Sequence, residues 1–128
     1  MQLARLDHLV LTVRNLDVSV DFYVRVLGMS LQTFDKDRKA LRFGSQKINL
    51  HESGKEFEPK AHHPTPGSAD LCFVVETPLP EVVDHVRGQG GEILLGPVQR
   101  TGAEGPMESV YLRDPDGNLI ELSRYRTD

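Results

Sequence analysis

The sequence predicts an α+β protein made of two tandem β-α-β-β-β modules, which occupy residues 4–51 and 69–125. The main observation is that strand-like and helix-like segments occur in the same order in both stretches. The chain has 128 residues, which suits one domain of two fused modules, because independent domains usually need about 100 residues each. The halves also share an offset of 62 residues between three pairs of landmarks: His8 and Asp70, Val13 and Val75, and Gly28 and Gly90.

The first module begins with residues 6–13, LDHLVLTV, whose aliphatic and β-branched side chains predict a largely buried strand. Asn15 predicts the N-cap of a helix, because apolar residues then recur at spacings of three and four as far as Leu27. Gly28 predicts the end of this helix, since a residue without Cβ easily adopts the left-handed cap conformation. Short strands are expected to follow at residues 29–34, 40–43 and 47–51.

The second module follows a connection at residues 52–68, which contains three prolines, two glycines and no sustained periodicity. A strand is expected at residues 69–75 and a helix at 79–87, where the glycine-rich segment GQGG ends it. Residues 100–106, RTGAEGP, suggest either a mobile flap with an anion-contacting Arg100 or an ordinary exposed loop. The remaining strands are expected at residues 93–95, 109–112 and 119–123.

Charge and apolar content argue against several classes of partner. The net charge is −4 and no basic stripe is present, so nucleic acid is not an expected partner. No stretch approaches the roughly 20 apolar residues of a membrane span, and the first residues have no apolar leader, so a cytoplasmic protein that binds small molecules is expected. Cys72 is the single cysteine and lies in the apolar run LCFVV, which predicts a buried structural thiol without a disulfide.

Two polar side chains lie within otherwise apolar strands. His8 lies in LDHLVLTV and Glu121 lies in LIELS, which follows the strong turn signal RDPDGN at residues 113–118. A buried, unpaired carboxylate costs several kcal/mol, so Glu121 must be neutral, paired, exposed or bound to a metal.

Three segments together resemble the vicinal-oxygen-chelate superfamily, which includes glyoxalases, bleomycin-resistance proteins and dioxygenases. They are LDHLVLTV, the FY-containing helix that ends in LGM, and DPDGNLIEL, and the resemblance covers roughly residues 4–125. The longer strings RKALRFGSQKINLHESGKEFEP and PTPGSADLCFV resemble a narrower subgroup of small glyoxalase-domain proteins, some of which are labelled virulence-associated. The resemblance implies a curved mixed sheet around a central cleft, and pairing as a homodimer.

The resemblance also implies a divalent metal, such as Zn²⁺, Ni²⁺, Mn²⁺ or Fe²⁺, held by the first and last strands of each module. His8 and Glu121 match the family's pattern, whereas Asp70 stands where a histidine is common. Matching INL to IEL places Asn49 at the remaining position, and His51 on the same face is the alternative ligand. A set of imidazole and carboxylate groups without thiolate suits such ions.

The resulting functional expectation is a metal-dependent, glyoxalase-like lyase or isomerase that acts on a small oxygenated substrate through an enediolate-like anion. Glu121 is the expected catalytic residue, and Asn49, Arg100 and Phe57 are expected to contact the substrate. Ring-cleaving dioxygenase chemistry is less expected, because Asp70 departs from the His-His-Glu triad of that branch. Two alternatives remain open: His8 bonded to Glu121 or Asp70 in a metal-free polar cluster, and a metal-free sequestering protein of the bleomycin-resistance type.

Overall fold

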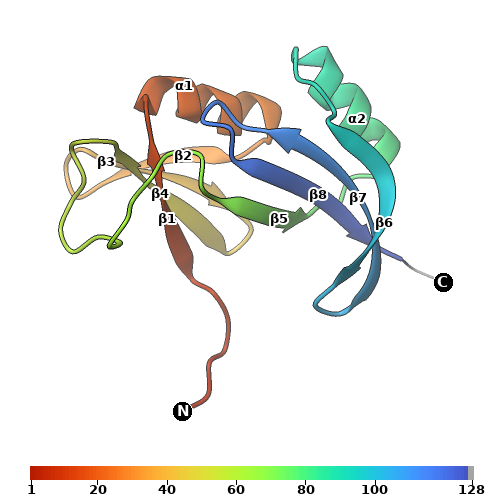
Figure 1. Ribbon diagram of the computed structural model, residues 1–128, viewed down its shortest axis with the longest axis horizontal. Coiled ribbons are helices and arrows are strands. Elements are labelled where there is room, and N and C mark those ends of the chain that lie inside the picture. Colours follow the sequence, from red (N-terminus) through yellow and green to blue (C-terminus); the bar gives the residue numbers. More distant parts are fainter. Residues whose placement is uncertain (127–128) are drawn as a thin grey trace. The chain divides into compact units, whose positions relative to one another are not determined.

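The computed structural model describes residues 1–126 and confirms the predicted α+β fold of tandem β-α-β-β-β modules (Figure 1). The chain divides into two compact units, Met1–Pro66 and a second unit that begins at Gly67. Each unit contains one four-stranded mixed sheet and its own helical segment. None of the helices among residues 1–126 is long and apolar enough to cross a membrane.

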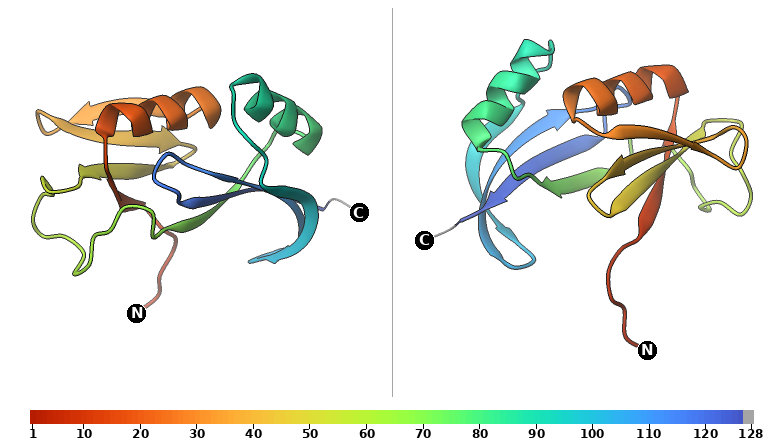
Figure 2. Two further views of the ribbon diagram at one scale, coloured as in Figure 1. Left: turned by 45° about the horizontal axis from the view of Figure 1, so that its top comes forward. Right: turned by 180° about the vertical axis from the view of Figure 1, so that it is seen from behind.

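The sheet of the first unit has the strand order β1-β4-β3-β2, in which β1 runs parallel to β4 and the other neighbours are antiparallel. Its helical segment packs on one face, where α1 contacts β4 (Figure 2). The elements are β1 (His8–Val13), α1 (Leu16–Asp21), the π-helical turn η1 (Phe22–Val26), β2 (Ser30–Phe34), β3 (Arg38–Phe43) and β4 (Gln46–Glu52).

The first helix differs from the single amphipathic helix that the sequence predicts. Its N-cap is as predicted, because the Asn15 side chain accepts a hydrogen bond of 3.0 Å from the Val18 backbone N–H. After Asp21, however, the chain winds as a π-helical turn, which has a wider hydrogen-bond spacing than an α-helix. This change of period brings Tyr23 and Val26 into the core, while Val18 remains 50% exposed.

The second unit repeats this arrangement, with the strand order β5-β8-β7-β6 and β5 parallel to β8. Pro80 lies in the first turn of the helix, where its missing N–H costs no hydrogen bond. The elements are β5 (Asp70–Val74), α2 (Leu79–Gly88), β6 (Leu95–Gly102), β7 (Gly105–Arg113) and β8 (Leu119–Tyr125).

The prediction of a flap or an exposed loop at residues 100–106 is wrong, because this segment forms the end of β6, the tip of the β6–β7 hairpin and the start of β7. Arg100 pairs with Met107, and Gly102 pairs with Gly105 at the tip. Glycine suits this tip, since Gly105 has a φ of +130° that other residues rarely adopt. The glycines and the proline of this segment resembled a loop, whereas the cross-strand hydrogen bonds with β7 determine the structure.

Side chains alternate between the two faces of each sheet, as the period of a strand requires. In each unit one face supplies apolar side chains to the core with the helix, including Leu11, Val13, Ile48 and Leu50 in the first unit and Val110, Leu112, Ile120 and Leu122 in the second. The opposite face of each sheet carries the strand residues for which the sequence predicts a function.

Candidate functional site

The strand register of the first unit places His8 and Asn49 close together on one sheet face. His8 lies opposite Lys47 on β4, so Asn49 is two residues, or one full strand period, further along. His51 shares this face but is four residues beyond Lys47, which is roughly 13 Å along the strand. Asn49 is 5% exposed, and within residues 1–126 its Oδ1 has no hydrogen-bond partner.

The second unit repeats this register with Asp70 and Glu121. Asp70 lies opposite Leu119, and Glu121 is two residues further along β8. The pair Asp70 and Glu121 is therefore the structural counterpart of His8 and Asn49. This register favours Asn49 over His51 as the first module's equivalent of Glu121.

Glu121 is oriented by two buried serines on the same face. Ser109 Oγ donates a hydrogen bond of 2.6 Å to Glu121 Oε2, and Ser123 Oγ donates a second of 3.1 Å. The two hydroxyls are 2.6 Å apart, and both residues are fully buried. No hydrogen bond reaches Glu121 Oε1 from the part of the chain that the structure covers, so this oxygen is available to a ligand. The sequence signal for the serines was weak, because Ser123 simply ends LIELS and Ser109 lies in an ordinary strand.

Cys72 lies on the same sheet face as Glu121, opposite it in the β5–β8 register. The expectation of a buried thiol is wrong, since Cys72 is exposed at the edge strand β5. Its surroundings still partly desolvate the sulfur, and this desolvation raises the pKa of the thiol. The carboxylates of Glu121 and Asp70 raise the pKa further, whereas a contact of 3.2 Å with Ser123 Oγ opposes them. The β5–β8 register places Asp70, Cys72 and Glu121 on one sheet face, and this group is called the acidic cluster below.

The turn between β7 and β8 links β5, which carries Asp70, to β8, which carries Glu121. Asn118 is 1% exposed; its Nδ2 donates to Asp114 Oδ2 at 2.7 Å, and its Oδ1 accepts from the Ala69 N–H at 2.8 Å. Asp114 Oδ1 also accepts hydrogen bonds from the backbone N–H groups of Asp116 and Asn118, both at 2.9 Å. Because Ala69 precedes Asp70, the Asn118 amide links the start of β5 to the strand that carries Glu121. The DPDGN motif thus positions the cluster, a role that the turn signal alone did not reveal.

His8 is paired with its sequence neighbour, Asp7. Its Nδ1 lies 2.8 Å from Asp7 Oδ1, and the hydrogen bond lowers the pKa of the Asp7 carboxyl. A carboxylate at Nδ1 favours the tautomer in which Nε2 carries the free lone pair.

His51 belongs to a different group of side chains, centred on Arg38. Arg38 Nη2 donates to His51 Nε2 over 3.4 Å, and the ring of His51 lies 5.5 Å from that of Phe57. His51 is 3% exposed, and its burial, together with the positive charge of Arg38, lowers the pKa of its imidazole; Glu56 opposes this effect. Since Nε2 accepts from a cation, His51 is poorly placed to bind a second cation.

Phe57 and Arg100, the other residues expected at a substrate, lie in separate units. Phe57 is 44% exposed, and its ring centroid is 4.8 Å from the guanidinium carbon of Arg38. Arg100 lies on β6, where its Nε donates to the hydroxyl of Tyr111 at 2.8 Å. Tyr111 is the register partner of Glu121, so Arg100 lies at the edge of the acidic cluster.

Within residues 1–126, no three or more His, Cys, Asp or Glu side chains are arranged to hold a metal ion. Of the predicted ligands, His8 and His51 lie in the first unit, and Asp70 and Glu121 lie in the second. Each unit by itself therefore contains two of the four predicted ligands.

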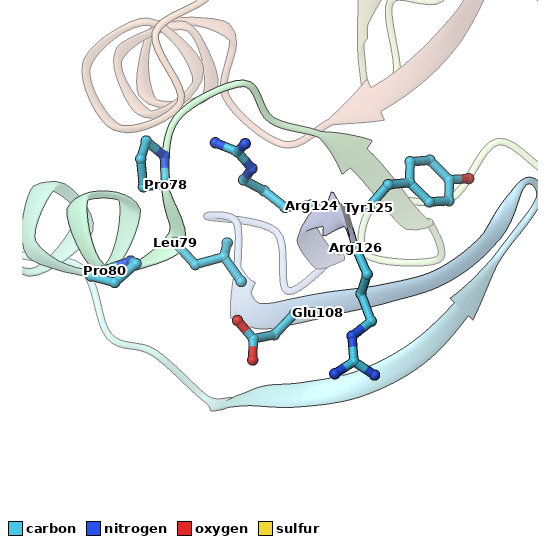
Figure 3. Close-up of a pocket in the computed structure, with 7 residues that line it drawn as sticks. All are labelled: Pro78, Leu79, Pro80, Glu108, Arg124, Tyr125 and Arg126. Carbon is cyan, nitrogen blue, oxygen red and sulfur yellow. The ribbon is translucent and has the colours of Figure 1, made fainter. Parts of the chain in front are cut away.

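A cavity of about 340 Å³ in the second unit lies away from these residues (Figure 3). Glu108 and Arg124, which pair across β7 and β8, alternate with Ser109 and Ser123 and so project from the opposite face of the sheet to Glu121. The lining residues are Pro78, Leu79, Pro80, Glu108, Arg124, Tyr125 and Arg126.

Known proteins resemble the chain over almost its whole length. A sequence model described as "Glyoxalase/Bleomycin resistance protein/Dioxygenase superfamily" matches residues 5–122. Virulence protein STM3117 of Salmonella typhimurium is 58% identical over 125 residues, which are 98% of this chain and 87% of that protein. Glyoxalase domain-containing protein RDO1 of Mycosarcoma maydis is 58% identical over 121 residues, which are 94% of this chain and 68% of that protein.

Solved structures show the same fold. The crystal structure of virulence protein STM3117 aligns with a TM-score of 0.97 at 57% identity, covering 98% of this chain and 100% of the other. Lactoylglutathione lyase from Agrobacterium tumefaciens aligns with a TM-score of 0.72 at 21% identity, covering 96% of this chain and 95% of the other. At that identity the second similarity concerns the fold alone.

Proposed function

Because this chain belongs to the Glyoxalase/Bleomycin resistance protein/Dioxygenase superfamily, we propose that it is a metal-dependent, glyoxalase-like lyase or isomerase. The substrate is a small oxygenated molecule that reacts through an enediolate-like anion. We also propose that the protein acts as a cytoplasmic homodimer.

The proposed metal ligands are His8, Asp70 and Glu121, with a divalent ion such as Zn²⁺, Ni²⁺, Mn²⁺ or Fe²⁺. The observation that carries this assignment is the orientation of the donor atoms. Asp7 occupies Nδ1 of His8 and leaves Nε2 for a ligand, the arrangement usual for metal-binding histidines. The two serines occupy Oε2 of Glu121 and leave Oε1. One imidazole and two carboxylates suit a hard or borderline divalent ion.

Of the other expected residues, His51 receives a new role in this proposal and Asn49 keeps the substrate contact expected of it. His51 positions Arg38, because its Nε2 already accepts a hydrogen bond from that guanidinium. Asn49 binds the substrate, since a substrate hydroxyl would satisfy its buried, unpartnered Oδ1.

A bound divalent ion would polarise neighbouring substrate oxygens and lower the energy of the anion. The protein's own contribution is proton transfer, for which we propose Glu121 as the catalytic base. The Ser109 and Ser123 hydroxyls hold Oε2 and fix the plane of the carboxylate. Oε1 therefore serves the two proposed roles in turn: it would hold the ion in the resting protein, and it would take the proton from the reacting C–H when the substrate is bound.

The experiment is deuterium exchange at the α-carbon of a small α-hydroxycarbonyl compound, dihydroxyacetone, followed by NMR with metal-loaded protein. Glu121→Gln should lower the exchange rate by about 100-fold or more, the usual contribution of a general base. Glu104→Gln, at an exposed position on the β6–β7 hairpin, is the matched control and should exchange like the parent protein. Equal rates for Glu121→Gln and the parent would contradict the assigned base.

A metal-free sequestering protein is the second candidate, and the aromatic residues near the predicted site favour it. Phe34 and Phe57 lie against Arg38, and Tyr111 lies against Arg100, so flat ligands have rings on which to stack. This candidate predicts tight binding of an aromatic ligand that persists in Glu121→Ala and in chelator-treated protein.

A further inference from the structure

We propose that the first unit contains an oxyanion-binding subsite centred on Arg38, which selects small molecules that carry a carboxylate or phosphate. The subsite deepens the proposed function by naming the substrate's charge. Its chemistry does not depend on a metal.

Arg38 is a partly buried cation without a carboxylate partner in residues 1–126. Arg38 Nη2 makes a long hydrogen bond of 3.4 Å to Nε2 of His51, which carries no negative charge. Within the described residues, Arg38 Nε is buried and has no hydrogen-bond partner. A guanidinium removed from water in this way is costly unless an anion compensates its charge. The available donors suit a carboxylate or phosphate, which arginine binds with two parallel hydrogen bonds.

Neighbouring side chains hold the guanidinium in place. The guanidinium carbon of Arg38 lies 5.0 Å from the ring centroid of Phe34, which ends the neighbouring strand β2. It lies 4.8 Å from the ring centroid of Phe57, which follows the other neighbouring strand, β4. His51, 3% exposed, contacts both Arg38 and Phe57. A cation fixed by rings and by a buried imidazole loses little rotamer freedom when an anion binds.

The charge of the sheet face points to the same ligand class. Arg42 is four residues after Arg38 on β3 and pairs with Lys47 on β4, so the side chains of Arg42 and Lys47 project from the same sheet face as Arg38. Glu52 is the single acidic residue in the four strands, and it contacts the backbone N–H of Leu16 on the helix side. Although the whole chain has a net charge of −4, residues 1–66 contain ten Lys or Arg and eight Asp or Glu.

Asn49 supplies a neutral contact beside this cationic group. It lies two residues from His51 on the same face, and its buried Oδ1 lacks a donor. A ligand with an oxyanion at Arg38 and a hydroxyl at Asn49 would satisfy both groups. This combination describes a hydroxy acid or a phosphorylated sugar fragment more closely than an uncharged or cationic molecule.

The test is an NMR titration of chelator-treated, full-length protein with sodium phosphate, sodium pyruvate and methyl pyruvate as the uncharged analogue. Arg38→Gln should weaken binding of the preferred anion by about 10-fold or more, as expected for losing a charge-assisted contact. Arg42→Gln removes the same charge from an exposed position on the same strand and face, and should weaken binding by less than about 3-fold. Arg38→Lys keeps the charge but loses the planar fork, and it should bind more weakly than the parent protein.

Phosphate or pyruvate binding that depends on Arg38 supports the subsite, and the tighter of the two anions identifies the ligand's charged group. Three results would overturn it: no binding of either anion at tens of millimolar, equal losses in Arg38→Gln and Arg42→Gln, or equal affinity for pyruvate and its methyl ester. If Arg38→Gln does not fold, Arg38→Lys decides, and parent-like affinity in that variant rejects the subsite. Because no metal is present, a failure here is distinguishable from a failure of the proposed metal site.

Discussion

Asn118→Ala should destabilise the protein strongly, because this buried amide links the start of β5 to the turn before β8. The substitution removes a neutral hydrogen bond to the Ala69 N–H and a charge-assisted one to Asp114. A neutral hydrogen bond typically contributes about 1 kcal/mol to stability and a charge-assisted one about 2 kcal/mol. The cavity left by the truncated side chain adds to this loss. We expect a loss of about 3 kcal/mol in the free energy of unfolding, which corresponds to a fall in Tm of roughly 10 °C.

The assay is urea unfolding followed by circular dichroism, with the Tm measured in parallel. Gln99→Ala removes an amide from an exposed strand position and is the control, with an expected change within about 0.5 kcal/mol. An Asn118→Ala variant that unfolds within 0.5 kcal/mol of the parent protein would refute the structural role assigned to the DPDGN turn.

Two further predictions follow from the electrostatics of the sheet faces. NMR titration should give His51 a pKa below its ordinary value, and Arg38→Gln should move that pKa upward. As the pH falls, His51 is protonated in the unfolded chain before it is protonated in the folded protein. The stabilisation that comes from keeping His51 neutral is therefore complete above about pH 6.5 and is lost as the pH falls towards the folded-state pKa. A free energy of unfolding that rises on acidification from pH 7, and does not rise in His51→Gln, would contradict this prediction. Cys72 should react slowly with iodoacetamide near neutral pH, because its thiol pKa is raised. Glu121→Gln should speed the reaction, since it removes a negative charge that raises this pKa. Unchanged reaction kinetics in Glu121→Gln would show that the two side chains do not interact.

The sequence predicted the duplicated fold well because its signals are local. The cap at Asn15, the left-handed Gly28 with a φ of +74° and the alternation of apolar residues each act within a few residues. The π-helical turn escaped prediction, because apolar residues at spacings of three and four are the signal of an ordinary α-helix and do not distinguish a local change of period. The β6–β7 hairpin escaped for a similar reason, since its partner strand supplies the hydrogen bonds that a glycine-rich segment does not encode.

The contacts of the site were less predictable than its strands. His8, Asn49, Asp70 and Glu121 project as the strand period requires, and the register adds the correspondence between the two modules. The sequence could not show that Ser109 on β7 would reach Glu121 on the neighbouring strand β8, since the residues are twelve positions apart. Arg38 was missed because a charged residue in a strand is usually exposed, and its contacts with Phe34, Phe57 and His51 come from residues distant in the sequence or on other strands.

The most direct test of the proposed metal site is the metal content of protein purified without chelator and incubated with Zn²⁺, Ni²⁺, Mn²⁺ or Fe²⁺. We predict one bound ion for each site in the parent protein and a large loss of metal in His8→Ala and in Glu121→Ala. His62→Ala, at an exposed loop histidine, should retain the parent content. Absence of stoichiometric metal from the parent protein with all four ions, or equal metal content in all variants, would contradict the central claim.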